Sequence, residues 1–358
     1  KFQDLDGFYG LRHFTGKEKR AYLNVIYDDN IGNADHKIKT GVSFLGLQLQ
    51  QFAAQPDGAM VVGNTRTELV PGVFTEYTYS GSRLSAVFGA RYDQHNLAGA
   101  QFSPRAHLKY ALTPQLDLRA TGGRAWRMPN YVADNLTLLA SSKVWVAATT
   151  LLPEISWNVG ASLVQGFSFK KRKGSISLDT YHTRFSQQLV ADRDSVSSLV
   201  IFKNLSDNSV ATVIQAEFAY EVLRGLDLRL AYKFQDVRAL YAGKLQNQVL
   251  LPRQRFFTNV AYQTRNKRWE YDLTYSRYSA VRLPQQGMGS PWALLNAQVT
   301  RSWKKTELYV GGENLLNFTQ HHPIMGVDNP FGSDFDATEI WAPIMGWNVY
   351  FGLRYTFK

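Results

Sequence analysis

Hydrophobic and polar residues alternate one by one along most of this chain. In the stretch RWEYDLTYSRYS (268–279), Trp269, Tyr271, Leu273 and Tyr275 occupy every second position. Charged and hydroxyl side chains fill most of the positions between them. Successive side chains of a strand point to opposite faces. The stretch therefore predicts a strand with one aromatic face and one charged face.

The same alternation recurs in 83–93, 210–222, 225–235 and 349–357, and no long window shows a clear helical period. We predict about fifteen strands, over 19–28, 36–50, 66–79, 83–94, 101–112, 115–126, 156–169, 173–191, 209–223, 225–238, 253–264, 268–282, 291–303, 306–317 and 347–358. The fold class is therefore all-β.

The connections between these strands alternate in length. Short connections fall near 80–82, 113–115, 170–173, 224–225, 265–267 and 304–305, and longer ones at 51–65, 95–100, 127–155, 192–208, 239–252, 283–290 and 318–346. A membrane barrel has tight turns on its periplasmic rim and long loops on its extracellular rim. We therefore predict a transmembrane antiparallel up-and-down β-barrel of the bacterial outer membrane. Its aromatic face would meet lipid and its charged face the lumen. A soluble β protein, the alternative, would not explain the asymmetry of the loops.

The amino-acid composition limits the kinds of site and partner that the chain can have. Cysteine is absent, which excludes disulfides and thiolate metal sites. The formal charge of +11 would suit nucleic acid, but the basic residues are scattered, and the clearest cluster, KKRK at 170–173, lies in a tight turn. We expect no nucleic-acid partner. Aromatic residues near strand ends predict girdles at the membrane interfaces, formed by Tyr131, Trp157, Tyr262, Trp269, Tyr278, Trp303 and Trp347.

Several motifs resemble those of TonB-dependent outer-membrane receptors. WRMPN (126–130) and LPEISWN (152–158) are similar to two barrel boxes of that family, and YVGGENLLNF (309–318) to its penultimate strand. The ending YFGLRYTF (350–357) resembles a membrane-insertion signal, carried by Gly352, Tyr355 and Phe357, which implies a periplasmic C-terminus. The C-terminal region looks most like receptors from the Bacteroidetes.

The resemblance implies a barrel of about twenty-two strands filled by a plug domain. With about fifteen strands visible, residues 1–358 are expected to be a single domain, the C-terminal portion of the barrel, with the plug outside this chain. The implied function is TonB-dependent uptake of a scarce, bulky nutrient, without enzymatic activity. A ferric siderophore or other iron complex ranks first, cobalamin second and haem third. The implied partners are the TonB complex, the lipid bilayer, lipopolysaccharide and the ligand, and a surface lipoprotein is left open.

Two other functions stay open. Bacterial barrels use even numbers of strands, so a further strand in 7–14 would give a sixteen-stranded passive porin. An outer-membrane enzyme or adhesin is the third alternative, although we find no nucleophile elbow, metalloprotease helix or phosphate-binding glycine loop.

The loop 319–346 carries most of the candidate chemistry. His321 and His322, close to Met325 and Asp328, could contact a ligand, a transition metal or haem iron. The carboxylates that could hold Ca²⁺ are Asp334, Asp336 and Glu339. The alternative for both groups is a solvated, well-packed loop. No other cofactor is expected.

The loop 127–155 is the second candidate for ligand binding. It carries little charge, and we expect Trp145, Val144 and Leu138 to be exposed, so that Trp145 and Tyr131 could contact a bulky ligand or a partner protein. Equally, the segment could fold into the mouth of the barrel. Haem receptors of the family often carry an Asn-Pro-x-Leu box and a histidine between the two boxes named above, and neither is present here.

Overall fold

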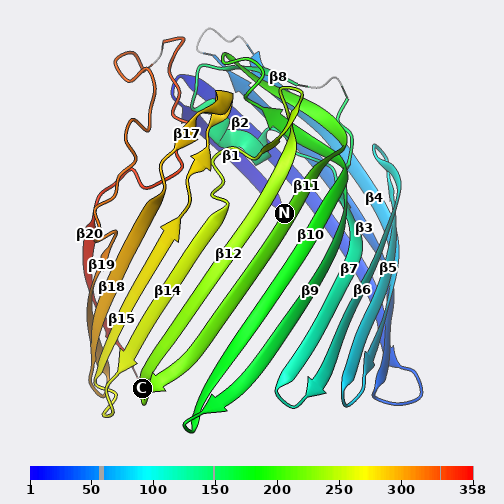
Figure 1. The fold of residues 1–358 in the computed structure, drawn as a ribbon. Coiled ribbons are helices and arrows are strands. Elements are labelled where there is room, and N and C mark those ends of the chain that lie inside the picture. Colours follow the sequence, from blue (N-terminus) through cyan, green and yellow to red (C-terminus); the bar gives the residue numbers. More distant parts are fainter. Residues whose placement is uncertain (56–59, 148–149, 331, 358) are drawn as a thin grey trace.

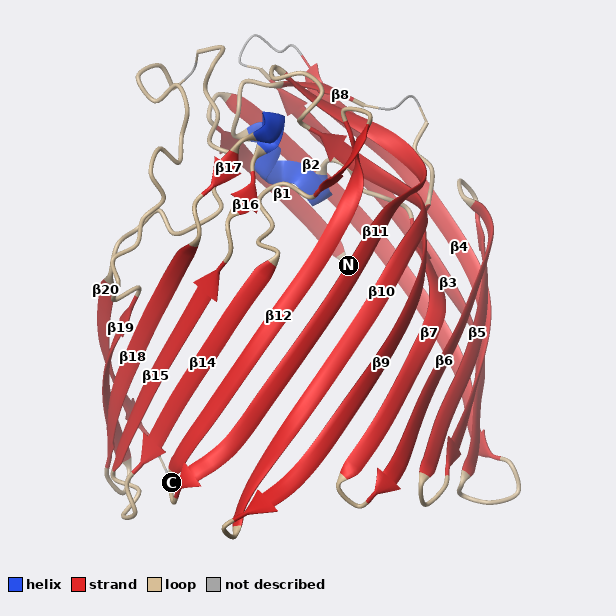
Figure 2. Ribbon diagram, viewed as in Figure 1, coloured by secondary structure: helices blue, strands red, loops and turns tan. Residues whose placement is uncertain are grey.

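The computed structural model describes residues 1–55, 60–147, 150–330 and 332–357. Eighteen strands form one sheet, which curls into an incomplete barrel (Figures 1 and 2). Its sixteen wall strands are β1 (Phe2–Tyr9), β2 (Arg12–Asn30), β3 (His36–Ala54), β4 (Met60–Ser80), β5 (Leu84–His95), β6 (Gly99–Thr113), β7 (Leu116–Arg127), β9 (Glu154–Phe169), β10 (Arg172–Asp192), β11 (Leu199–Leu223), β12 (Leu226–Tyr241), β14 (Gln254–Gln263), β15 (Trp269–Tyr278), β18 (Trp292–Ser302), β19 (Thr306–Glu313) and β20 (Asn348–Tyr355). The predicted all-β, up-and-down architecture is confirmed.

The smaller elements belong to the connections. They are the strands β8 (Val144–Val146), β13 (Lys244–Asn247), β16 (Val281–Arg282) and β17 (Met288–Gly289), and the 3-10 helices η1 (Ala133–Leu139) and η2 (Pro284–Gln286). Figure 2 shows the helical segment across the mouth of the barrel, among the long loops. No helix in the described part of the chain is long and apolar enough to span a membrane.

Each wall strand pairs antiparallel with the next one along the chain, and the connections separate into two rims. The turn rim consists of the tight connections 31–35, 81–83, 114–115, 170–171, 224–225, 264–268 and 303–305. The loop rim carries the remaining connections, including 128–153 and 314–347. Among the described residues, β1 pairs only with β2 and β20 only with β19, so the sheet does not close.

The predicted alternation divides the two faces of the wall. On β15, the outward Tyr271 stacks on Tyr262 of β14, with ring centroids 6.2 Å apart. The next residue, Asp272, faces inward and accepts a hydrogen bond of 2.9 Å from Asn259. Pairing of polar groups with one another on the inner face leaves the outer face to aromatic and aliphatic side chains. This separation is the one that a membrane-spanning sheet requires.

Several predicted boundaries were wrong. The structure adds β1, which raises the count from fifteen to sixteen, and β2 begins at Arg12 rather than near residue 19. The predicted loop 192–208 is mostly strand, because β10 and β11 pair as far as Asp192 and Ile201. The predicted loop 51–65 is likewise largely strand, from the pairing of β3 with β4. Conversely, β15 and β19 end before the predicted 282 and 317.

The last two strands of the sheet, β19 and β20, contact each other through reciprocal pairs of an aromatic ring and a glycine. Tyr309 of β19 pairs with Gly352 of β20, and a Cβ atom on Gly352 would overlap the Tyr309 ring. In the same way, Tyr350 of β20 covers Gly311 of β19. A larger residue at either glycine would displace a ring. Gly352 therefore has a packing role in the sheet, besides the insertion signal to which we assigned it from sequence.

Candidate ligand-facing site at the loop rim

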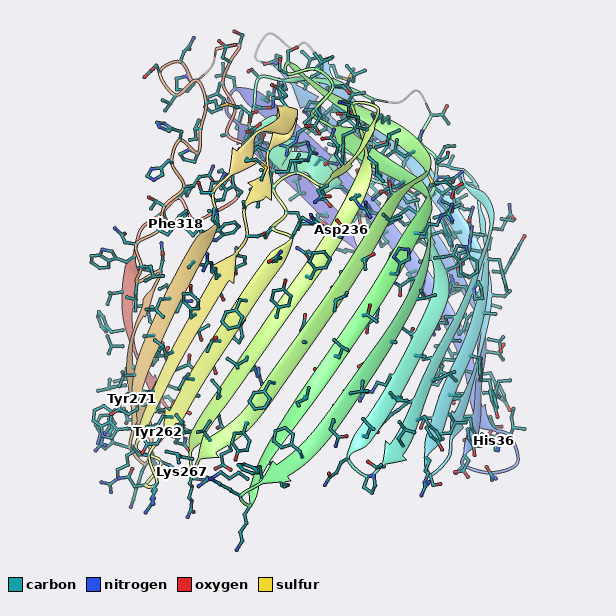
Figure 3. The ribbon with its side chains drawn as sticks, viewed as in Figure 1. His36, Asp236, Tyr262, Lys267, Tyr271 and Phe318 are labelled. Carbon is teal, nitrogen blue, oxygen red and sulfur yellow. The ribbon has the colours of Figure 1, made fainter. Side chains whose placement is uncertain are left out.

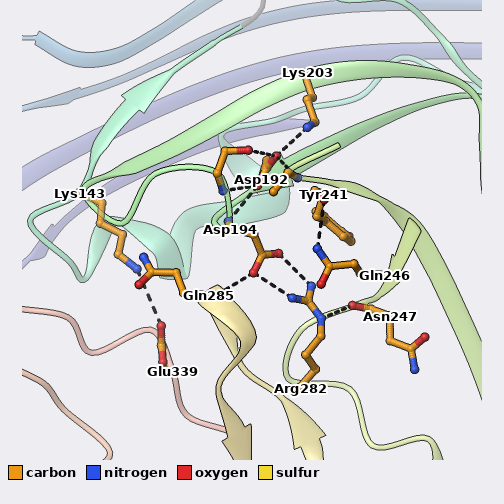
Figure 4. Close-up of polar contacts among 12 residues, drawn as sticks. Lys143, Asp192, Asp194, Lys203, Tyr241, Gln246, Asn247, Arg282, Gln285 and Glu339 are labelled. Carbon is orange, nitrogen blue, oxygen red and sulfur yellow. Dashed lines mark hydrogen bonds and ion pairs between the residues drawn. The ribbon is translucent and has the colours of Figure 1, made fainter. Parts of the chain in front are cut away.

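A short turn between β10 and β11 (residues 193–198), which we call the central turn, joins several loops of the rim. Asp192, which precedes it, accepts hydrogen bonds from the backbone N–H groups of Asp194 and Ser195 at 2.8 and 3.1 Å. Its other oxygen contacts the Lys203 ammonium at 2.6 Å and the N–H of Ala242 at 3.2 Å. The carboxylate thus shapes the turn and ties it to the end of β12 (Figure 4).

Asp194 links the central turn to the connection between β15 and β18. Its two oxygens accept hydrogen bonds from both terminal nitrogens of Arg282, at 2.8 and 2.9 Å. The backbone N–H of Gln285 donates a third, at 2.8 Å. Arg282 also donates to the carbonyl of Asn247 at 2.6 Å and lies over the Tyr241 ring, 5.4 Å from its centroid. These contacts hold three loops in one arrangement (Figure 4).

The long loop 314–347 docks on the same region through Lys143. The Lys143 ammonium lies 2.7 Å from Asp336 and 3.8 Å from Glu339. Asp336 also accepts hydrogen bonds from the backbone and hydroxyl of Thr338, at 2.8 and 2.6 Å. Burial raises the pKa of the Glu339 carboxyl, and the nearby Lys143 ammonium opposes that shift.

An apolar cluster underlies these polar contacts, and we call it the cap core. Its members are Phe14, Ala53, Val62, Tyr131, Val132, Leu138, Leu139, Trp145, Val200 and Phe202. The Phe202 ring lies 5.3 Å from Tyr131 and 4.9 Å from Trp145, and β8 pairs parallel with β11 beside it. The segment 128–146 therefore spans the mouth, from the ends of β2–β4 to β11.

A cavity of about 380 Å³ lies beside the cap core, and Arg193 of the central turn lines it. The Arg193 side chain is buried and donates one hydrogen bond, of 3.2 Å, to the hydroxyl of Thr338. Among the described residues, no carboxylate lies within ion-pair distance of its guanidinium. Burial lowers the pKa of Arg193, yet an arginine stays charged in a protein. Glu339, Asp336 and Asp194 act on this guanidinium electrostatically without direct contact. A buried cation without a direct ion pair, in a cavity at the mouth, can bind an anionic group of a ligand.

Residues 2–315 match the sequence model of the family described as "TonB dependent receptor-like, beta-barrel". The chain belongs to this family. No curated protein sequence matches it. The predicted resemblance to TonB-dependent receptors is thereby confirmed.

Solved structures of TonB-dependent receptors share the fold. The ferric enterobactin receptor PfeA of Pseudomonas aeruginosa, a mutant in complex with enterobactin, superposes with a TM-score of 0.66 at 16% identity, over 96% of this chain and 55% of that one. The FrpB iron transporter of Neisseria meningitidis gives 0.66 at 10% identity, over 96% and 55%. The copper transporter OprC gives 0.67 at 15% identity, over 96% and 58%. The chain therefore spans a little over half the length of these relatives.

The structure places the candidate residues of this receptor barrel in three settings. His321, His322 and Asp328 are exposed on loop 314–347, and Met325 is half exposed, bridged through its backbone to Asp336. Their ligand role stays a prediction. Asp336 and Glu339 come together around Lys143, whereas Asp334 is exposed. The described residues include no group of three or more potential metal-ligating side chains.

Trp145 and Leu138 are buried, so the expectation that the 127–155 loop exposes them was wrong, whereas Val144 is exposed as expected. Tyr131 is buried as well. The loop folds into the mouth instead, as the alternative had it. The Tyr131 hydroxyl donates to the carbonyl of Gly63 at 2.8 Å, which places this ring in the mouth of the barrel rather than in an interfacial girdle. Contact of Trp145 with a ligand would require this cap to open, whereas Tyr131 also lines the cavity beside Arg193.

The residues that organise the rim were not found from the sequence. Asp192, Asp194, Arg193 and Arg282 lie in stretches that read as ordinary polar loops, and Asp194 is 88 positions from Arg282. The one local signal is the run ADRDS (191–195), in which closely spaced Asp and Ser residues favour a side-chain-stabilised turn. Nothing in the sequence indicates which distant cation that turn meets.

Proposed function

We propose that this chain is the larger part of the barrel of a TonB-dependent transporter, which takes up a scarce, bulky nutrient across the bacterial outer membrane. The observation that carries the proposal is the capped mouth of a barrel wall of this family. Two long connections, 128–153 and 314–347, and the central turn converge over the inner face, and the cavity they leave is lined by Arg193, which has no direct ion pair among the described residues. An open diffusion channel would have no use for a packed cap.

In this proposal the loop rim is extracellular, and the turn rim and C-terminus are periplasmic. The plug, through which the TonB complex would deliver energy, would lie in the part of the relatives' length that this chain does not span. A ferric siderophore or other iron complex is the first ligand, followed by cobalamin and haem. Support comes from similar solved structures that are a ferric enterobactin receptor and an iron transporter, and from Arg193, which suits an anionic ligand. The lipid bilayer and lipopolysaccharide would surround the wall.

A passive porin is the second candidate, and the sixteen wall strands favour it, because porins have about sixteen to eighteen strands. In the described residues, however, β1 and β20 do not pair with each other, so this wall leaves two open edges. Unpaired strand edges cannot face lipid. Further strands between β20 and β1 would pair both edges, as the family's larger barrel implies. The outer-membrane enzyme or adhesin has no observation of its own here.

The first experiment is the intact mass and N-terminal sequence of the species purified from outer membranes. A mass well above 40.6 kDa, with an upstream plug, is expected. Growth under iron or cobalamin limitation would then be compared in cells with and without the gene, and with and without TonB. Uptake that depends on both is the expected result. A species of this mass alone, with TonB-independent conductance in planar bilayers, would establish the porin instead.

A further inference from the structure

The outer face of the wall, at the turn rim, holds an arginine between two tryptophans. Arg301 is the penultimate residue of β18, and its guanidinium carbon lies 4.7 Å from the Trp269 ring centroid and 5.4 Å from that of Trp303. Trp269 stacks on Tyr271 at 6.2 Å, and Tyr271 stacks on Tyr262 at 6.2 Å. Figure 3 shows Tyr262 and Tyr271 near the turn rim, close to Lys267. The rings hold the guanidinium in place on the outside of the barrel.

In the part of the chain that the structure describes, no acidic side chain forms an ion pair with Arg301. The nearest carboxylates along the neighbouring strands, Glu270 and Glu307, alternate with the outward positions and therefore belong to the inner face. Glu307 is paired there with Arg354, at 3.0 Å. Among the described residues, Arg301 has ring contacts but neither an ion pair nor a hydrogen bond from its side chain. Its five N–H donors are therefore available to an external acceptor.

The turns on either side of Arg301 add positive charge. The segments 264–268 and 303–305 contain no acidic residue. Their basic side chains are exposed and form no ion pair among the described residues, and they are Arg265, Lys267, Arg268, Lys304 and Lys305. Together with Arg301, Trp269 and Trp303 they make up what we call the Arg301 patch. It combines a positioned guanidinium, exposed cations of the two neighbouring turns and aromatic residues.

We propose that the Arg301 patch binds the phosphate group of an anionic phospholipid, in the membrane leaflet at the turn rim. The inference rests on the proposed function, because that function places this wall in a membrane. Arginine presents a planar fork of donors that matches phosphate oxygens. Tryptophan resides at the level of the headgroups, and clustered basic residues attract anionic lipid surfaces. A zwitterionic lipid would be bound more weakly, because its own ammonium group competes for the phosphate.

The test is native mass spectrometry of the full-length protein in detergent, titrated with phosphatidylglycerol or with phosphatidylethanolamine. The wild type should retain phosphatidylglycerol preferentially, and Arg301→Gln should bind it about fivefold more weakly, the loss expected for one basic group at an anionic lipid surface. Arg83→Gln is the matched control, since Arg83 is an exposed arginine beside another tight turn and has no ring contact among the described residues. An excess of inorganic phosphate should not displace the bound lipid.

Three results would each overturn the proposal. The wild type could retain both lipids equally, Arg301→Gln and Arg83→Gln could bind phosphatidylglycerol equally, or inorganic phosphate could displace the bound lipid. If Arg301→Gln does not fold, Arg301→Lys serves in its place. This variant keeps the positive charge but loses the planar set of donors, so it should bind phosphatidylglycerol with intermediate affinity. Heat-modifiable migration reports the folded barrel. If the protein shows no lipid preference but still resides in the outer membrane and still mediates uptake, the lipid site is rejected and the proposed function is not. Absence from the outer membrane would sink the proposed function.

Discussion

Asp194 and Arg282 form a two-fold contact between loops that are 88 positions apart in the chain, with both carboxylate oxygens bound at 2.8 and 2.9 Å. Both side chains are largely buried, at 4% and 13% exposure. The contact fixes the central turn against the connection between β15 and β18. The arrangement of the rim therefore depends on a charge pair rather than on the barrel wall alone.

Replacement of this pair should loosen the loops without unfolding the wall. Asp194→Asn leaves the buried Arg282 charge without its anion, which costs about 3 kcal/mol when the pair is buried. We expect a corresponding loss of hydrogen-exchange protection in 193–198 and 281–289. Asp207→Asn is the control, because Asp207 and Arg184 form an exposed pair, 3.5 Å apart, worth at most about 1 kcal/mol. Equal effects of the two variants would contradict the prediction.

Arg193 allows ligand affinity to be separated from stability. Arg193→Gln removes a charge whose burial is unfavourable, so it should leave the melting temperature unchanged or raise it. Loss of a charged hydrogen bond should weaken binding of an anionic ligand about tenfold. Calorimetric or fluorescence titration of the purified protein would measure this. A variant that binds as tightly as the wild type would remove Arg193 from the site.

Adjacent residues of β8 should differ sharply in their contribution to the cap. Trp145 is 7% exposed within the cap core, whereas Val144 is 57% exposed. Trp145→Ala should destabilise the cap by about 3–5 kcal/mol and make 128–146 sensitive to protease. Val144→Ala should change stability by no more than about 0.5 kcal/mol. Similar rates of cleavage for the two variants would show that the mouth is not closed by this packing.

Docking of loop 314–347 should weaken as pH rises, because of Glu339. The pKa of this carboxyl is raised in the folded protein, so the folded state binds the proton more tightly than the unfolded state does. Its contribution is fully present below the ordinary value of 4.5 and is lost as pH rises through the raised value. Glu339→Gln should abolish this component. Hydrogen exchange of 314–347, corrected for the intrinsic effect of pH, would measure it, and an unchanged pH profile in the variant would contradict it.

The C-terminal aromatic residue can be tested apart from the fold. Phe357 and Phe351 are 88% and 89% exposed, and the Phe357 ring contacts Tyr355, at 4.9 Å between ring centroids. If Phe357 belongs to an insertion signal, Phe357→Ala should lower the amount of heat-modifiable protein in the outer membrane several-fold, and Phe351→Ala should not. Equal yields would assign Phe357 no special role. Gly352 is less suitable for this test, because its substitution would disturb the Tyr309 ring.

The wall of the barrel could be predicted because its two faces meet different surroundings. In 268–279 neighbouring residues face opposite sides of the wall, so hydrophobic and polar residues alternate in the sequence. The signal fades where strands continue beyond the alternating region. Residues 199–206 are paired in β11, but Val200, Phe202 and Leu205 of this part pack in clusters within the protein, and no hydrophobic–polar alternation marks it in the sequence.

The candidate site was only partly predictable, because its partners are distant in the chain. Asp336 and Glu339 were singled out from the sequence as possible Ca²⁺ ligands, a role that stays a prediction, but their ion-pair partner Lys143 lies in another loop. Trp145 was expected to be exposed because its own loop has little charge, whereas Phe202 of β11 covers it. The spacing of residues within one loop does not indicate which distant residues that loop contacts.

The cap is made of contacts with unusually long sequence separation. Arg12 donates to the carbonyl of Lys143 across 131 positions, and Ser142 donates to that of Phe335 across 193. Closing such loops costs chain entropy that is recovered only after the intervening segments are ordered. During biogenesis the hairpins of the wall should therefore form first and the cap last. Because the cap forms only after the wall strands are paired, a molecule with a formed cap also has a completely assembled wall.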